Sequence, residues 1–167
     1  MSEKSQPVES SEMLALVLLA MVPFVWFGLI TGISFIETPL KFRAPGMTHA
    51  LGVGIGRLVF KVLNLIEVAL MVVLLCAWTQ EQELVSVPAG IFIILAVLAL
   101  TLQVLVLRPA MNKRTSALAD TALTHTGTTA VKAKVATLTH IAYIGLEFLK
   151  TVSLPMAGIL IILAVAG

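Results

Sequence analysis

The sequence predicts an all-α protein, a four-helix transmembrane bundle, and three observations support this prediction. Only 12% of the residues are charged, whereas soluble domains have about 25%. The sequence shows no alternating segments of the kind that build membrane barrels. Four apolar runs each have a length close to that of a helix that crosses a bilayer, which is about twenty residues. These runs occupy residues 13–35, 58–78, 87–107 and 144–166.

Residues 1–12 are polar and net acidic, whereas a secretory signal begins with a basic segment. We therefore expect a mobile polar tail here, followed by a single four-span domain over residues 13–167. In the first span we expect Pro23 to kink the helix, because proline removes a backbone hydrogen bond. Gly28 and Gly32 form a GxxxG pair, which either lets a second helix approach closely or occurs by chance in an apolar helix.

The segment that links the first two spans contains prolines and glycines that argue against a continuous helix. Gly52, Gly54 and Gly56 are spaced GxGxG. A dinucleotide site needs GxGxxG after a strand, and the sequence predicts no strand here. We therefore interpret the three glycines as a tight turn that leads the chain back into the membrane.

Pro88, at the start of the third span, is a favoured first-turn residue, and Arg108 stands at the end of that span. The loop over residues 110–135 is rich in Ala and Thr, and its first half predicts a short amphipathic helix on the membrane surface. We expect Pro155 to kink the fourth span and to free the carbonyl group of Thr151 for a polar contact.

The distribution of basic residues predicts the orientation, because Lys and Arg are enriched in cytoplasmic loops. Nine of the eleven basic residues lie near or within the first and third loops, whereas the second loop holds Glu81 and Glu83 and no base. We therefore expect both termini outside (N-out/C-out), in a bacterial inner membrane. The basic residues form no run that would follow a nucleic acid, so we expect no nucleic acid among the partners.

Two spans carry a stripe of polar residues on an otherwise apolar helix. With about 100° per residue, the polar residues of span four fall within about 80°, and those of span two, which include Arg57 and Lys61, within about 120°. Ionisable groups inside a membrane usually face the bundle interior, and the outer halves of the spans are almost purely apolar. The sequence therefore predicts an inward-facing cluster. Its candidate ligand-binding residues are Glu37, Asn64, Glu67, Arg108, His140, Tyr143, Glu147 and Lys150.

Three interpretations of this cluster stay open. The first is a set of structural ion pairs, such as Glu67 with Lys150, or Glu37 with Arg57 or Arg108. The second is a binding site for a small molecule or a proton. The third is a metal site built on Glu37, His140 and Glu147, although such sites usually contain more histidine or cysteine. The apolar outer halves argue against an open channel, no catalytic triad is indicated, and the residues do not identify a cofactor.

The leading functional hypothesis is small-molecule or ion transport or binding, and the alternative is a non-catalytic accessory subunit of a larger membrane complex. A membrane-embedded enzyme with Glu147 or His140 as a base is weaker, so we regard enzymatic activity as the less favoured hypothesis. Expected partners are the lipid bilayer and either further copies of the chain or a larger complex. Four spans leave little room for alternating access, which favours a homo-oligomer for a transporter.

The overall plan is similar to one family. Three features carry the similarity: a basic first loop, an arginine-proline exit from span three in LRPAMNKRTSAL, and His140 at the opening of span four. With these features the chain resembles the small four-span membrane proteins of unknown function found in bacteria and animals. The segments ETPLKFRAPG, NLIE and YIGLEFLK depart from that pattern. The resemblance implies a four-helix bundle and no defined activity.

Overall fold

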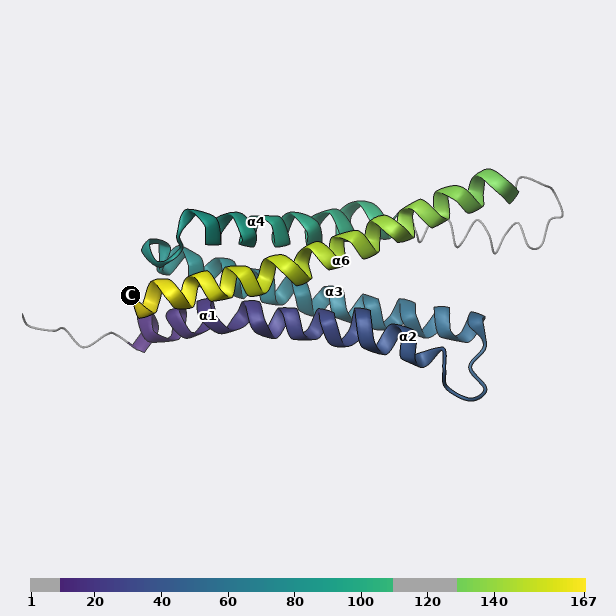
Figure 1. Cartoon of the computed structure of the whole chain (residues 1–167), viewed down its shortest axis with the longest axis horizontal. Helices are drawn as coiled ribbons and strands as arrows, with labels where there is room; N and C mark the ends of the chain where they lie inside the picture. The colour runs from purple at the N-terminus through teal and green to yellow at the C-terminus, as the bar shows by residue number, and fades with distance from the viewer. Residues whose placement is uncertain (1–9, 110–128) are drawn as a thin grey trace, which may run out of the picture.

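The computed structural model describes residues 10–109 and 129–167, and these form a bundle of long helices (Figure 1). Residues 1–9 of the expected polar tail and the surface helix expected in the third loop lie outside the described residues. Residues 10–12, also expected in the tail, instead form the first turn of a helix. In chain order the elements are α1 (Ser10–Ile30), the π-helical η1 (Thr31–Glu37), α2 (Thr38–Lys41), α3 (His49–Gln80), the 3-10 turn η2 (Gln82–Leu84), α4 (Val87–Leu102), the π-helical η3 (Gln103–Leu107) and α6 (Thr129–Ala166).

Four of these helical stretches are long and apolar enough to span a membrane, which confirms the predicted four-span, all-helical architecture. They cover Ser10–Lys41, Leu51–Gln80, Val87–Leu107 and Ile141–Ala166. The chain is therefore an integral membrane protein. The first span extends beyond the predicted end at residue 35, because the acidic residue that closes the apolar run is neutralised within the helix. Glu37 forms an ion pair of 3.2 Å with Lys41, one turn further on.

The expected tight turn at the three glycines is wrong, because Gly52, Gly54 and Gly56 lie inside α3. The chain turns earlier, at Gly46, whose positive φ of 78° suits a residue without a Cβ. Thr48 then caps α3 by accepting a hydrogen bond of 3.3 Å from the backbone N–H of Leu51. The first loop therefore ends at Thr48, where the capped helix that contains the second span begins.

Two of these glycines serve close packing. A Cβ on Gly52 would collide with the ring of Phe42, and a Cβ on Gly56 would lie 3.1 Å from Lys41 Nζ. The glycines one turn apart on α3 thus make room for side chains that come from the end of the first span. The lack of side chains here lets α2 and its following loop lie against α3.

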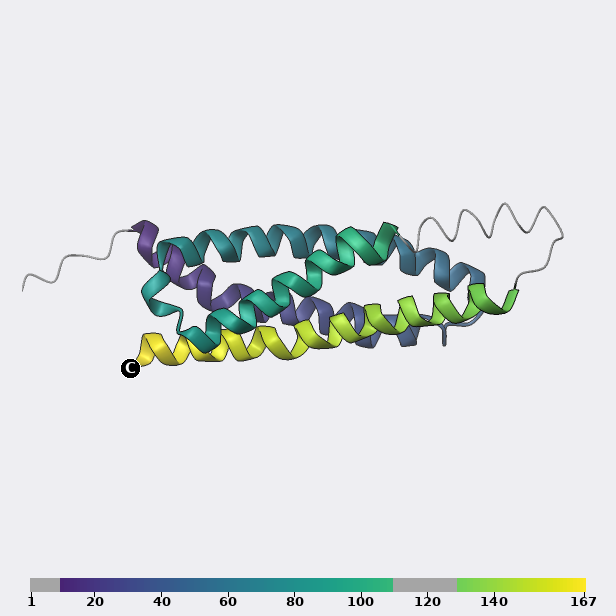
Figure 2. The same ribbon diagram turned by 90° about the horizontal axis from the view of Figure 1, so that it is seen from above.

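The helices pack in the order α4 on α6, α6 on α1, and α1 on α3, and Figure 2 shows them running lengthwise beside one another. We call the end where α1 begins and α6 finishes the terminus end. The opposite end, where α2 finishes and α3 begins, is the first-loop end (Figure 1). Helices α1 and α6 both continue through their internal prolines, Pro23 and Pro155.

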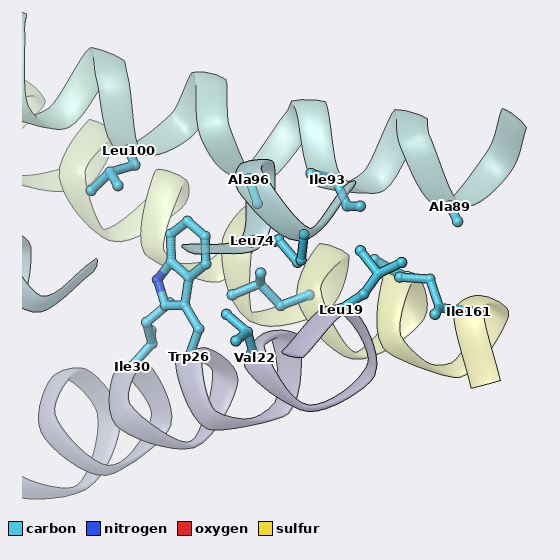
Figure 3. Close-up of a cluster of buried hydrophobic side chains, with 13 residues drawn as sticks. Leu19, Val22, Trp26, Ile30, Leu74, Ala89, Ile93, Ala96, Leu100 and Ile161 are labelled. Carbon is cyan, nitrogen blue, oxygen red and sulfur yellow. The ribbon is translucent and has the colours of Figure 1, made fainter. Parts of the chain in front are cut away.

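An apolar core fills the bundle toward the terminus end. Figure 3 shows its side chains meeting from the four long helices, with the indole of Trp26 among them. Gly158 of α6 permits close contact with α1, since a Cβ there would lie 2.6 Å from the ring of Phe24. By contrast, a Cβ on Gly28 or Gly32 would meet no atom within 4 Å. The GxxxG pair therefore does not form a packing face within the described part of the chain.

Candidate functional site

Three ionisable side chains meet in the interior of the bundle. Lys150 Nζ of α6 lies 2.5 Å from Glu67 Oε1 of α3 and 3.4 Å from Glu147 Oε2. The side chains of Lys150 and Glu67 are completely buried, and that of Glu147 is 2% exposed. Glu147 and Lys150 are three residues apart on one helix, so they share a face. One ammonium group thus lies between two carboxyl groups.

The first helix contributes a hydrogen-bond donor that sequence reasoning missed. Trp26 Nε1 donates to Glu67 Oε1 over 2.9 Å, and both side chains are fully buried. In the sequence Trp26 looks like one more apolar residue of span one. A signal was nevertheless present: tryptophan favours the membrane interface, whereas Trp26 lies in the middle of its span, where a buried N–H needs an acceptor.

The third span supplies an amide. Gln103, the first residue of η3, donates from Nε2 to Glu147 Oε1 over 3.1 Å and to the backbone carbonyl of Tyr143 over 3.3 Å. Two buried acceptor atoms, Gln103 Oε1 and Glu147 Oε2, have no hydrogen-bond partner among the described residues. Glu147 Oε2 lies within ion-pair distance of Lys150, but the geometry of a hydrogen bond is not met.

A polar pair extends the site toward the first-loop end. Tyr143 Oη lies 3.1 Å from the Asn64 amide. With that amide turned so that its nitrogen replaces its oxygen, Asn64 donates to Glu67 Oε2 over 3.2 Å and to the carbonyl of Phe60 over 3.3 Å. We favour the turned orientation, because it gives the amide nitrogen acceptors and links Tyr143 to Glu67. The ring of Phe60 packs edge-on against Tyr143, with centroids 5.6 Å apart.

We call the connected side chains the buried polar network. It comprises Trp26, Asn64, Glu67, Gln103, Tyr143, Glu147 and Lys150. Five of these belong to the eight predicted candidates, so helical periodicity identified most of the cluster. The network draws on all four spans, and every member is 7% exposed or less.

Two predicted residues, Glu37 and Arg108, stand apart from the network. Glu37 pairs with Lys41 of its own helix, and its side chain is 36% exposed. The sequence-based pairing of Glu37 with Arg57 or Arg108 is therefore wrong, because span one continues far enough to offer a partner at i+4. Arg108 follows η3 and is partly exposed. The side chain of His140 lies outside the described residues.

The network occupies one level of the bundle. In α3 the buried polar residues Asn64 and Glu67 precede the buried apolar Leu74 and Ala77 along the chain, and in α6 Glu147 and Lys150 likewise precede Leu154 and Ile161. In the third span the direction is reversed, so Gln103 follows the buried Leu100. Beyond the network toward the terminus end, the buried residues of these helices are apolar except for Ser153, and the apolar core closes that end.

The described residues offer no cluster of three or more His, Cys, Asp or Glu side chains that would hold a metal ion. The metal interpretation depended on Glu37, which is now paired elsewhere, and on His140. The chemistry that the network does supply is hydrogen bonding and charge: two carboxyl groups, one ammonium group, and the amide oxygen of Gln103 that lacks a partner in the described structure.

Comparison with known proteins adds no identity. No family model matches the chain, no curated protein is similar to it, and no solved structure is similar to it. The resemblance to small four-span membrane proteins therefore stays a prediction. What the sequence and structure establish is an integral membrane protein with four spanning helices around a buried polar network.

Proposed function

We propose that this integral membrane protein is a small transport or ligand-binding protein whose site is the buried polar network. The observation that supports the proposal is the complete burial of Glu67, Glu147 and Lys150 together, inside a bundle that is otherwise apolar at its core. Ionisable residues within a membrane span usually mark a pathway or a site.

The energetics favour a functional role over a structural one. A charged side chain at the centre of a membrane helix costs about 2.5–3.5 kcal/mol on insertion scales. A polar contact between membrane helices contributes only about 1 kcal/mol. Replacing a buried ion pair by apolar side chains of similar volume is often neutral or stabilising. Three charged groups at one level are therefore a poor way to hold the bundle together.

The hydrogen bonding of the network points the same way. A network that serves structure alone satisfies its own donors and acceptors. Here Gln103 Oε1 and Glu147 Oε2 are buried without a hydrogen-bond partner among the described residues. Both atoms are acceptors, so the network suits a ligand that donates hydrogen bonds or carries positive charge.

We expect the ligand to reach the buried polar network from the first-loop end. The apolar core separates the network from the terminus end, and Tyr143, Asn64 and Phe60 continue the network in the opposite direction. The excess of Lys and Arg in the first and third loops favours a cytoplasmic location for that end. We thus propose termini outside, an inner-membrane location, and a network that opens to the cytoplasm.

Native mass spectrometry of the protein, gently extracted from its own membrane, tests the proposal. Any small molecule or ion that the wild-type chain carries in the network should be absent from Glu147→Gln. Glu37→Gln is the matched control, because Glu37 is a carboxylate of the first span outside the network, and it should keep the ligand. A ligand that persists in Glu147→Gln would contradict the proposed site.

An accessory subunit is the second candidate, and one observation favours it. Gly28 and Gly32 leave open space beside the first span, and a GxxxG face accommodates a helix from another chain. The same spectra distinguish the two functions. A larger partner protein bound to the wild-type chain, and equally to Glu147→Gln, would favour the accessory subunit.

A further inference from the structure

We propose that the ligand of the buried polar network is a proton, carried by Glu147 and exchanged with water at the first-loop end. This inference rests on the proposed function, because it names the ligand of the same site. It is argued from the charges of the network, from the hydrogen bonds of its two carboxyl groups, and from the burial of the side chains.

The charges of the network do not balance when every group is ionised. Two carboxylates, Glu67 and Glu147, face one ammonium group, Lys150, which leaves one negative charge over. The other side chains of the network supply no second cation. Gln103 from η3 contacts Glu147, Trp26 from α1 and Asn64 from α3 contact Glu67, and Tyr143 contacts Asn64; none of these side chains is a cation. Lys41 is engaged with Glu37 at the first-loop end. One proton brings the network to neutrality.

The two carboxyl groups differ in their hydrogen bonds, and the difference identifies the carrier. Glu67 accepts from Trp26 and Lys150 at Oε1, and from the turned Asn64 amide at Oε2. Both of its oxygens are thus used as acceptors. Glu147 accepts from Gln103 at Oε1 only. Its Oε2 lies 3.4 Å from Lys150 Nζ, at ion-pair distance, but has no hydrogen-bond partner among the described residues. Glu147 Oε2 is therefore the atom that is able to take an O–H bond without breaking an existing hydrogen bond.

The burial of the network favours a proton over a larger ligand. Glu67, Gln103 and Lys150 are 0% exposed, and Glu147 is 2% exposed. A bound molecule would need these side chains to separate, whereas a proton needs no cavity. In the exchange, the O–H bond at Glu147 Oε2 breaks and the proton passes to water, while the electron pair stays on the carboxylate. The network then changes from neutral to one negative charge.

Infrared spectroscopy of the purified protein in lipid nanodiscs tests this directly, because a protonated carboxyl group has a carbonyl stretching band that a carboxylate lacks. We expect the wild-type protein to show a buried carboxyl band that is lost reversibly as the pH rises. Glu147→Gln should lack the band, and Glu37→Gln should keep it. Should Glu147→Gln fail to fold, Glu147→Asp retains a carboxyl group and should show the band at a changed frequency.

Several outcomes would overturn the inference. They are a band that persists in folded Glu147→Gln, the absence of any buried carboxyl band, or an unchanged frequency in Glu147→Asp. Loss of the band on adding sodium at constant pH would assign the site to a metal cation instead. If no carboxyl titrates but mass spectrometry finds a molecule that depends on Glu147, the proposed function holds and the proton is wrong. If neither a titrating carboxyl nor a bound ligand exists, both proposals fail.

Discussion

Lys150 is the residue on which the charges of the network depend, because it is shared between two carboxyl groups. It lies 2.5 Å from Glu67 Oε1 and 3.4 Å from Glu147 Oε2, and its side chain is fully buried. Removing Glu67 leaves Lys150 with a second carboxylate. Removing Lys150 leaves two buried carboxyl groups without a cation, which makes the ionised form of either one unfavourable in a low dielectric. Removing Lys150 should therefore destabilise the bundle more than removing Glu67.

This asymmetry predicts the stability of three variants. We expect Lys150→Met to lower the free energy of unfolding more than Glu67→Gln does. The double variant should be less damaged than Lys150→Met alone, because only Glu147 then remains as a buried carboxyl group. The coupling free energy between the two sites should reach about 1–2 kcal/mol, as for strong polar contacts in membranes. Unfolding in detergent titrated with SDS measures all four members of the cycle.

The Glu37 and Lys41 pair provides a control for this cycle. Its two atoms are 3.2 Å apart, but the Glu37 side chain is 36% exposed. The Lys41 side chain is 8% exposed, so the pair is partly buried, and a pair at i,i+4 on a helix is worth about 0.3–0.5 kcal/mol. The cycle of Glu37→Gln and Lys41→Met should therefore show little coupling. Additive effects at Glu67 and Lys150 would contradict the pairing inside the bundle.

Helix α6 depends on a single glycine for its contact with α1. A Cβ built on Gly158 would lie 2.6 Å from the ring of Phe24, so Gly158→Val forces the helices apart or the ring out of place. Overpacking of this kind costs about 1–3 kcal/mol. We expect a corresponding fall in the thermal midpoint of the purified protein, followed by circular dichroism in detergent.

Gly145→Val is the matched control, because Gly145 lies on the same helix and a Cβ there meets nothing within 4 Å. It should leave the midpoint close to that of the wild-type protein, which separates packing from any general effect of valine on the helix. Equal losses in the two variants would contradict the close approach of α1 and α6.

Helical periodicity was enough to predict most of the network but not its complete membership. Counting about 100° per residue placed Asn64 and Glu67 on one face of span two, and Tyr143, Glu147 and Lys150 on one face of span four. The structure joins these faces. Trp26 was missed because periodicity within an apolar span does not show which face meets a carboxylate on another helix. That pairing is set by packing between residues 41 positions apart.

The ends of the spans were harder to predict than their existence. Glu37 seemed to close the first span, yet its i+4 pairing with Lys41 allows the helix to continue. The π-helical segments η1 and η3 have no simple signature in the sequence, because their spans are apolar on most faces and a rotated helical face leaves no visible break in the pattern. They lie in two different spans on the first-loop side of the apolar core, and π-helical turns are frequent at functional sites.

On the scale of the whole molecule, polarity and charge vary in the same direction along the bundle. Most of the buried polar residues lie on the first-loop side of the apolar core, and the described basic residues Arg43, Arg57 and Arg108 lie toward that same end. The loop at the terminus end contains η2, with Glu81 and Glu83 and no base. If the basic end faces the cytoplasm, the network exchanges its ligand with the cytoplasm and the apolar core seals the outside.

Cysteine labelling decides this orientation. In a Cys76→Ala background, which removes the single native thiol, we would place one cysteine at Glu83 in the second loop or at Arg43 in the first. A membrane-impermeant maleimide should label Glu83→Cys in intact bacterial cells, and Arg43→Cys only after permeabilisation. The parent Cys76→Ala protein should stay unlabelled in both conditions. The reverse pattern would place the first and third loops outside, and the buried polar network would then be open to the external side of the membrane.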